Sequence, residues 1–318
     1  MKNPAQNVQS QIYTYSLNRN KANNSIKIPA EKVICFSTSH IAFVDLLEKQ
    51  NTICAISGSQ YVYNETIRQK IETAEIPELG YGSALDLEKI AALKPDVIFA
   101  YGVDNNNLQE YQKVESLGIP VVWIGEYLEE TMLGRSEWLK VFACFFDDLN
   151  FAETQFDSLA NNYELLKDNI SQFNSQKPLV LTGLPFQGIW YVPGEKSFLA
   201  NLINDAGGEL VIQNKNKRES SALSIEEVFK KGSEATVWLN LNNITSQEMI
   251  LQSDSRFKNF QPLTKAKLYN NNKRKAGRDG NDFFESSVIH PDKALNDLIN
   301  IFHKDSIKAD ELFYYEKL

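Results

Sequence analysis

The sequence has few of the residues that build metal centres and disulfide frameworks, with three histidines and three cysteines among 318 residues. Cys35, Cys54 and Cys144 lie singly inside apolar segments without metal-ligand spacing, which predicts buried, reduced thiols. No P-loop, nucleophile elbow or complete dinucleotide fingerprint is present. These absences argue against an enzyme, and we therefore predict no catalytic residue, no protein-bound metal and no cofactor.

Long apolar runs are also missing. Because no run of about 18 apolar residues exists, we expect no membrane span. The N-terminus has no charged segment followed by an apolar one, so either the protein is cytoplasmic or a targeting segment lies outside this chain. A net charge of -8 and a pI near 5.1 argue against a nucleic-acid partner. The basic run 265–278 is a local exception, typical of a solvated loop or of a site for an anionic ligand.

Apolar residues recur at helical spacing between residues 133 and 173 and predict two helices. Asn150 with Glu153 three residues later forms a capping-box pattern, so the second helix should begin near Phe151 and extend to Phe173. At about 1.5 Å per residue it would span roughly 35 Å. Such a helix is either a strut between two α/β lobes or an ordinary core helix of a single domain.

Short apolar runs alternate with helical segments on both sides of this helix. The runs 32–36, 53–58, 97–102 and 121–125 predict a mostly parallel sheet with ligand-bearing loops that begin at Ser37, Ser57, Tyr101 and Glu126. Strands at 179–183, 190–194, 236–241 and 267–270, with helices at 197–206 and 291–303, predict a second α/β lobe. The expected organisation is an N-terminal arm (1–30), an N-terminal lobe (31–133), linker helices (134–174) and a C-terminal lobe (175–318).

One internal repeat relates the two halves. The segments 85–90 and 223–228 share the pattern Leu, cap residue, aliphatic, Glu, charged, aliphatic. Each predicts a helix with Asp or Ser as N-cap and with Glu88 or Glu226 in the first turn. Stabilisation of a helix dipole explains either glutamate alone, but it does not require the pair.

With these residues in view, the chain resembles the substrate-binding proteins of bacterial ABC importers for cobalamin, haem and iron-siderophores. The resemblance rests on DLEKIAALKPDVIFAYG (Asp86–Gly102), on the order lobe, helix, lobe, and on Ser224-Ile225-Glu226. The segments LEETMLGRSEWLKVFACFF, LTGLPFQGIWYVPGEKSFLA, LYNNN and NDFFESSVIHPDKALNDLINIFH are similar to a Bacteroidetes branch of this family. The resemblance implies two Rossmann-like α/β lobes with mostly parallel sheets, joined by one long backbone helix.

The resemblance also implies a function. It predicts a monomer that binds a metal-chelate or corrinoid between its lobes and delivers it to an ABC permease dimer, so that any Fe or Co belongs to the ligand. By position, Glu88 and Glu226 would dock onto arginines of the permease. The family further implies a periplasmic location, with a lipid anchor as in lipoproteins.

Candidate ligand contacts lie on loops at the carboxyl ends of strands. Aromatic side chains with polar tips suit a large, flat or cyclic ligand. Tyr101 is the first choice, because cobalamin-binding relatives carry an aromatic residue there. The full set of expected contacts is His40, Tyr61, Tyr81, Tyr101, Glu126, Tyr127, Phe186, Trp190, Tyr191, Asn271, Arg274, Asp282, Phe283, Phe284 and Glu285.

Several assignments stay open at this point. Phe186, Trp190 and the Phe283-Phe284 pair suit either a core or a cleft, whereas Tyr63 suits a core. His40 would ligate a metal of the ligand or hydrogen-bond its own loop. Arg135 would contact an anionic ligand or, as we favour, pair with Glu126 or Glu129. The rival functions are a direct Mn, Zn or Fe receptor that uses His40 with carboxylates, and a metal-dependent enzyme.

Overall fold

The computed structural model describes residues 13–20, 25–80, 85–102, 105–173, 176–304 and 311–318. The chain divides into two compact units: unit 1 comprises residues 1–128, 134–158 and 275–289, and unit 2 comprises residues 129–133, 159–274 and 290–318. Residues 275–289, which the predicted boundaries place in the C-terminal lobe, therefore pack within unit 1. None of the described helices is both long enough and apolar enough to cross a membrane.

Unit 1 is built on a four-stranded parallel sheet in the order β4-β3-β5-β6. The predicted runs all contain these strands. The elements of unit 1 are β1 (Leu17–Asn18), β2 (Ile26–Lys27), β3 (Val33–Cys35), α1 (Thr38–Leu46), β4 (Ile53–Ile56), α2 (Glu65–Glu72), α3 (Leu87–Leu93), β5 (Val97–Ala100), α4 (Asn105–Ser116), β6 (Val121–Trp123), most of α5 (Met132–Phe146), the first half of α6 (Leu149–Asp168), β13 (Lys275–Ala276), β14 (Gly280–Asn281) and α11 (Asp282–Ser286).

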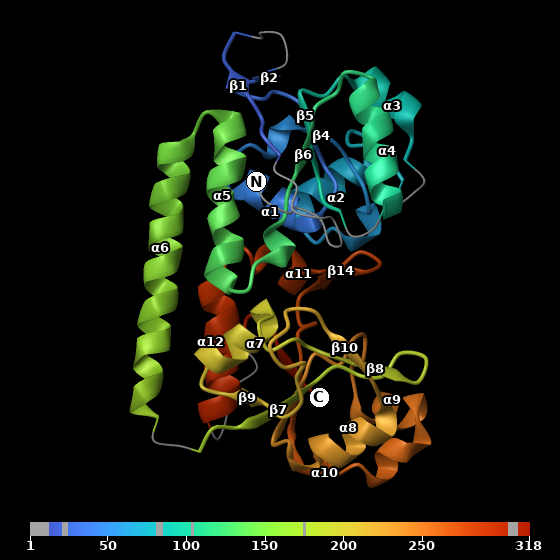
Figure 1. Cartoon of the computed structure of the whole chain (residues 1–318), viewed down its shortest axis with the longest axis vertical. Coiled ribbons are helices and arrows are strands. Elements are labelled where there is room, and N and C mark those ends of the chain that lie inside the picture. The colour runs from blue at the N-terminus through green and yellow to red at the C-terminus, as the bar shows by residue number, and fades with distance from the viewer. Residues whose placement is uncertain (1–12, 21–24, 81–84, 103–104, 174–175, 305–310) are drawn as a thin grey trace. The chain divides into compact units, whose positions relative to one another are not determined.

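Both faces of this sheet are buried, because alternate side chains of a strand point to opposite faces. On β5, Val97 and Phe99 join one apolar cluster with α1 and α5, and Ile98 and Ala100 join a second cluster with α3 and α4. Figure 1 shows these helix pairs on opposite sides of the sheet. The carboxyl edge of the sheet is left for the connecting loops.

The two predicted helices around residue 147 are α5 and α6. They are separated by Asp147, whose φ of 56° is incompatible with a continuous helix. α6 begins at Leu149, two residues before the predicted start, and ends at Asp168, where the 3₁₀ turn Asn169–Gln172 follows in place of the predicted helix to 173. Residues up to 158 belong to unit 1 and later residues to unit 2, so the chain passes from one unit to the other along α6.

Unit 2 has a five-stranded sheet in the order β15-β12-β11-β7-β9, parallel except for β15. Its elements are β7 (Leu179–Thr182), β8 (Ile189–Val192), α7 (Phe198–Asp205), β9 (Glu209–Leu210), β10 (Ser221–Ser224), α8 (Ile225–Lys231), β11 (Val237–Leu239), α9 (Gln247–Ser253), α10 (Gln261–Lys265), β12 (Lys267–Asn270), α12 (Pro291–His303) and β15 (Glu316–Lys317). The predicted strand near 190 is β8, but it pairs with β10 in a separate antiparallel sheet.

The core of unit 2 is aromatic. Trp190 stacks on Trp238 with ring centroids 5.9 Å apart, and Phe257 packs against both rings. The Trp190 indole N–H donates a 2.9 Å hydrogen bond to the carbonyl of Thr182 at the end of β7. These contacts anchor the β8–β10 sheet to the main sheet of unit 2.

Candidate functional site

A pocket of about 260 Å³ lies in unit 1 where β3, β4 and β5 end. This position follows from the parallel sheet, because the loops after parallel strands emerge at one edge. Three of the four predicted loop starts, Ser37, Ser57 and Tyr101, contribute to it. The described residues that line the pocket are Phe36, Ser37, Thr38, Ser57, Gly58, Tyr61, Tyr101, Asp279, Asn281 and Phe284.

One wall of the pocket comes from the hairpin β13–β14 and from α11, far away in sequence. The amide of Asp279 donates a 3.0 Å hydrogen bond to the carbonyl of Gln60. A Cβ on Gly280 would lie 2.7 Å from the carbonyl oxygen of Val62, so only glycine allows this close approach. The basic run predicted as a loop or an anion site thus ends in a hairpin that packs on the loop after β4.

The loop after β4 is held by two carboxylates. Glu78 accepts hydrogen bonds from the amides of Gly58 and Ser59 at 3.0 and 2.6 Å. Glu285 of α11 accepts from the amides of Tyr63 and Asn64 at 2.7 and 2.8 Å. Tyr61 lies between these anchored pairs. The loop is therefore fixed on both sides of a pocket-lining aromatic residue.

This geometry corrects the predicted role of Glu285 as a ligand contact. Its carboxylate is buried, and both of its oxygens are used by backbone amides. Burial raises the pKa of Glu285 to about 8, and the neighbouring Asp282 and Asp45 act in the same direction. Asp282 and Phe283 are buried as well, whereas Phe284 is exposed and lines the pocket.

A buried polar cluster lies on the same edge of the sheet. Ser39 donates a 2.6 Å hydrogen bond to Glu126, and Arg135 lies close enough for its charge to interact with that carboxylate. Burial lowers the pKa of Arg135, and Glu126 opposes this shift. The favoured pairing of Arg135 with a glutamate is thus supported by the structure. Glu126 is itself buried and does not line the pocket.

His40 is fully buried, which corrects its predicted role as a ligand contact or metal ligand. Its Nδ1 lies 3.2 Å from the carbonyl oxygen of Phe99 at the end of β5. Burial lowers the pKa of His40 to about 4, although Glu126 favours the charged ring. The imidazole is therefore neutral at pH 7, and it packs against the pocket residue Tyr101 with ring centroids 6.4 Å apart.

Tyr101 is positioned from two sides by aromatic rings. Besides His40, it contacts Tyr127 with ring centroids 6.3 Å apart. The hydroxyl of Tyr127 donates a hydrogen bond to the carbonyl of Gly102. Tyr127 is thus placed to support Tyr101 and is not among the described residues that line the pocket. The predicted contact Tyr81 lies outside the described residues.

Some candidate residues of unit 2 are exposed and others are buried. On β8 the two kinds alternate along the strand. Trp190 has 0% of its surface exposed, which corrects its expected ligand contact. Tyr191 is 55% exposed and Phe186, just before β8, is 66% exposed. Of the two residues after β12, Asn271 is buried, and Arg274 places its guanidinium 4.2 Å from the centre of the Phe313 ring.

The repeated helix starts form as predicted. Asp86 caps α3 by accepting a hydrogen bond from the amide of Lys89 at 2.9 Å. Ser224 caps α8 in a capping box with Glu227. Glu88 and Glu226 are both exposed in these first turns. Their presence at corresponding positions of the two units agrees with the internal repeat.

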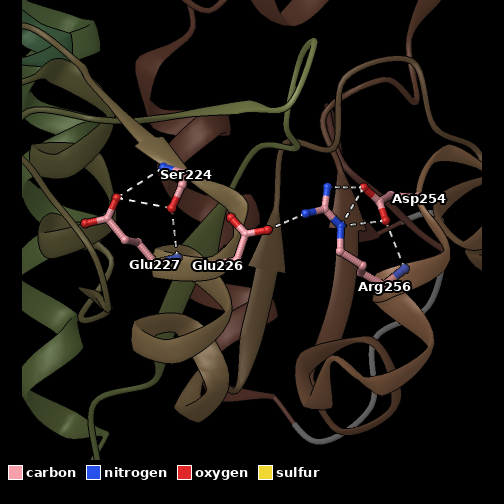
Figure 2. Close-up of polar contacts among 5 residues, drawn as sticks. All are labelled: Ser224, Glu226, Glu227, Asp254 and Arg256. Atoms are coloured by element: carbon pink, nitrogen blue, oxygen red, sulfur yellow. Dashed lines mark hydrogen bonds and ion pairs between the residues drawn. The ribbon is translucent and has the colours of Figure 1, made fainter.

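The two glutamates differ in their surroundings. Figure 2 shows Glu226 pointing to Arg256, with Glu226 Oε1 and Arg256 Nη1 2.5 Å apart. The guanidinium of Arg256 is held in turn by Asp254 through Nε and Nη2. Among the contacts of the described residues, Glu88 has no such partner. The ion pair with Arg256 therefore gives the side chain of Glu226 a defined direction.

The sequence predicted most of the loops that form the pocket, but it missed many of the residues that line it. Phe36, Ser37, Thr38, Ser57, Gly58, Asp279 and Asn281 line the pocket and were not proposed as contacts. The loop starts at Ser37 and Ser57 signalled the first five. No sequence signal distinguished Asp279 and Asn281 from the rest of a polar loop. Within the described ranges, no group of three or more His, Cys, Asp or Glu residues is arranged to hold a metal ion.

The amino-acid sequence matches the family model described as periplasmic binding protein over residues 33–269. A curated relative, an uncharacterized lipoprotein of Methanocaldococcus jannaschii, is 24% identical over 300 residues, which are 92% of this chain and 70% of the relative.

Solved structures of low sequence identity share the fold. A periplasmic haem-binding protein from Pseudomonas aeruginosa has a TM-score of 0.66 at 14% identity and covers 91% of this chain and 98% of its own. The siderophore-binding protein FhuD of Vibrio cholerae, solved with Fe³⁺-Desferal, has a TM-score of 0.62 at 16% identity, with coverages of 86% and 99%. The vitamin B12-binding protein BtuF of Vibrio cholerae has a TM-score of 0.58 at 16% identity, with coverages of 86% and 96%.

These matches confirm the predicted family and its helical-backbone α/β fold, while the Bacteroidetes branch stays a prediction. With the family model matched over most of the sequence, the chain belongs to the periplasmic binding protein family.

Proposed function

We propose that this protein is the substrate-binding component of an ABC importer for a metal-chelate or corrinoid. The observation that carries the proposal is the pocket at the carboxyl edge of the unit 1 sheet, in a chain of this family. Tyr61, Tyr101 and Phe284 give it three aromatic side chains, which suit a large, flat or cyclic ligand. The haem, Fe³⁺-Desferal and vitamin B12 bound by the structural neighbours belong to this chemical class.

Tyr101 is the proposed principal contact, and the fixed loop around Tyr61 supplies a second. Both are positioned before ligand binds, which lowers the entropy lost on association. Phe186 and Tyr191 of unit 2 are exposed aromatic residues and stay predicted contacts. Any iron or cobalt arrives with the ligand, in agreement with the buried state of His40 and Glu285.

We propose that Glu88 and Glu226 dock the protein onto a permease dimer. Both are exposed first-turn glutamates at corresponding positions of the repeat. Matched controls exist in each unit, because Glu65 of α2 and Glu248 of α9 are also exposed glutamates in the first turn of a helix. Replacing Glu88 and Glu226 by alanine should abolish ligand-dependent transport in proteoliposomes with the cognate permease, whereas replacing Glu65 and Glu248 should not.

The proposed location is outside the cytoplasmic membrane, with a lipid anchor. Support comes from the periplasmic binding protein family and from the lipoprotein name of the Methanocaldococcus relative. The proposed working form is a monomer. Metabolic labelling of the full-length gene product with a radioactive fatty acid tests the anchor, and absence of label from the mature protein would refute it.

Equilibrium dialysis tests the proposed binding function. The purified protein is dialysed against cyanocobalamin, haemin and ferric siderophores, each measured by its visible absorbance, with ZnCl₂ and MnCl₂ measured by elemental analysis. We expect stoichiometric binding of one chelate with a Kd below about 1 μM, the range in which the binding free energy exceeds about 8 kcal/mol. Tight binding of bare metal without any chelate would indicate a direct metal-ion receptor and refute the proposal.

A further inference from the structure

The direction of hydrogen bonding at the pocket edge follows from a chain of two serine hydroxyls. Ser39 Oγ lies 2.6 Å from Glu126 Oε1, and Ser37 Oγ lies 2.9 Å from Ser39 Oγ. The carboxylate of Glu126 is buried near the guanidinium of Arg135, a group that stays protonated in proteins. In this contact the Ser39 hydroxyl donates and the Glu126 oxygen accepts.

This assignment fixes the proton of Ser37 as well. A serine hydroxyl has one proton, and that of Ser39 is already given to Glu126. Ser37 is therefore the donor in its contact with Ser39. Its oxygen does not cap α1, although Ser37 is the N-cap residue. Because Ser37 lines the pocket, its lone pairs are left to accept a hydrogen bond from a ligand.

The opposite wall adds one carboxylate and one neutral amide. Asp279 lines the pocket with a side chain that is 43% exposed, and its one ion-pair neighbour among the described contacts is Arg278, 3.6 Å away and 85% exposed. Asn281 uses its Oδ1 to cap the amide of Phe283, which leaves its NH₂ group as a neutral donor. No lysine, arginine or histidine is among the described residues that line the pocket.

We propose that this wall selects chelates that present hydrogen-bond donors and a neutral or cationic surface, such as an amide-bearing corrinoid or a hydroxamate siderophore with an ammonium group. Porphyrin carboxylates and catecholate siderophores are disfavoured, because their negative charge would face Asp279 and the Ser37 lone pairs without a cation from the described lining. The inference rests on the proposed function and narrows its ligand class.

Competition at one pH and ionic strength tests this preference. The protein is titrated with cyanocobalamin and ferrioxamine B, which carry amide or ammonium donors, and with haemin and ferric enterobactin, which carry carboxylates or a net negative charge. We expect either cyanocobalamin or ferrioxamine B to bind at least tenfold more strongly than both haemin and ferric enterobactin. If haemin or ferric enterobactin binds most tightly, the charge inference fails while the proposed function stands. If none binds, both fail.

Three variants test the residues that carry the argument. Asp279→Asn should weaken the binding of ferrioxamine B by about 2–5-fold, as expected for the loss of an exposed charge pair. The binding of cyanocobalamin should weaken less. Ser37→Ala should weaken the preferred chelate by about 2–10-fold by removing one acceptor. Ser39→Ala should also weaken the binding of the preferred chelate, but by less than Ser37→Ala does. It releases the Ser37 proton from its hydrogen bond to Ser39 and leaves the Ser37 oxygen in place.

The control is Glu65→Gln, which removes an exposed carboxylate of unit 1 outside the pocket lining. It should change no affinity. Because exposed charge pairs are screened by salt, the Asp279→Asn effect on ferrioxamine B should shrink as salt rises from about 0.05 to 0.5 M. Equal affinities of wild type and all three pocket variants for every chelate would refute the assignment of Ser37 and Asp279 to ligand selection.

Discussion

Two opposing effects act on the pKa of Glu285, and an experiment can show which of them is larger. Its oxygens accept two backbone N–H bonds, which favour the charged carboxylate, while burial favours the neutral acid. Burial is the larger effect and raises the pKa of Glu285 to about 8 from 4.5. Glu285→Gln keeps the shape of the side chain and removes the titration.

The size of the effect follows from the two contacts. Glutamine offers one acceptor oxygen, so either Tyr63 or Asn64 would lose its partner. An unsatisfied backbone N–H costs about 1–3 kcal/mol, and the partial burial of this loop favours the lower end. We expect Glu285→Gln to lower the free energy of unfolding by that amount near pH 5, as measured by urea denaturation.

The pH dependence has a definite sign. Because the folded-state pKa is raised, the folded protein binds more protons than the unfolded one between about pH 4.5 and pH 8. The stability advantage of the wild type over Glu285→Gln is therefore fully present below pH 4.5 and declines as the pH rises through 8. Each pKa unit corresponds to about 1.36 kcal/mol, so the decline is on the order of a few kcal/mol.

Glu72→Gln is the matched control, because Glu72 is exposed in the same unit. Its stability relative to wild type should not change over this pH range. An advantage of the wild type over Glu285→Gln that stays constant from pH 5 to pH 9 would show that the N–H bonds outweigh burial, and it would refute the reasoning. The test also reports on the pocket, since the affected loop carries Tyr61.

Three further predictions concern other parts of the chain. Replacing Glu88 and Glu226 by alanine should abolish transport in proteoliposomes and leave ligand Kd and Tm nearly unchanged, and a large drop in Tm would mean that the glutamates are structural. Trp190→Ala should cost about 3–5 kcal/mol in urea denaturation, because it empties the stack on Trp238, and a variant of wild-type stability would contradict the core assignment. Gly280→Ala should weaken chelate binding in dialysis by displacing the hairpin, whereas unchanged affinity would show that the hairpin is not a pocket wall.

The sequence predicted those parts of the fold that depend on local pattern. Strand β12 at Lys267–Asn270 and helix α12 at Pro291–His303 have the predicted bounds, and an apolar stripe marks the helix. The start of α6 was misplaced because Asn150 suggested a cap, whereas the chain turns earlier at Asp147. Strand β8 was recognised, but its antiparallel partner β10 was not, because pairing between distant segments leaves no local signal.

The candidate site was also predicted only in part, because local sequence patterns reveal its loops but not the contacts between distant segments. The loops after β3, β4 and β5 follow from the parallel sheet, and Tyr61, Tyr101 and Phe284 line the pocket. The wall from the hairpin β13–β14 was missed, because the chain returns to unit 1 only at residue 275. Trp190 and His40 were misassigned, because the sequence gives residue types at loop ends but not the direction in which each side chain points.

The most direct test of the proposed function is equilibrium dialysis of wild type and Tyr101→Ala against cyanocobalamin, haemin and ferric siderophores. Tyr101 lines the pocket and is held by His40 and Tyr127, so its loss removes a preorganised contact. We expect one chelate to bind the wild type below about 1 μM and to bind Tyr101→Ala at least tenfold more weakly, a difference of about 1.4 kcal/mol. Absence of chelate binding, or equal affinity of the two proteins, would contradict the proposal.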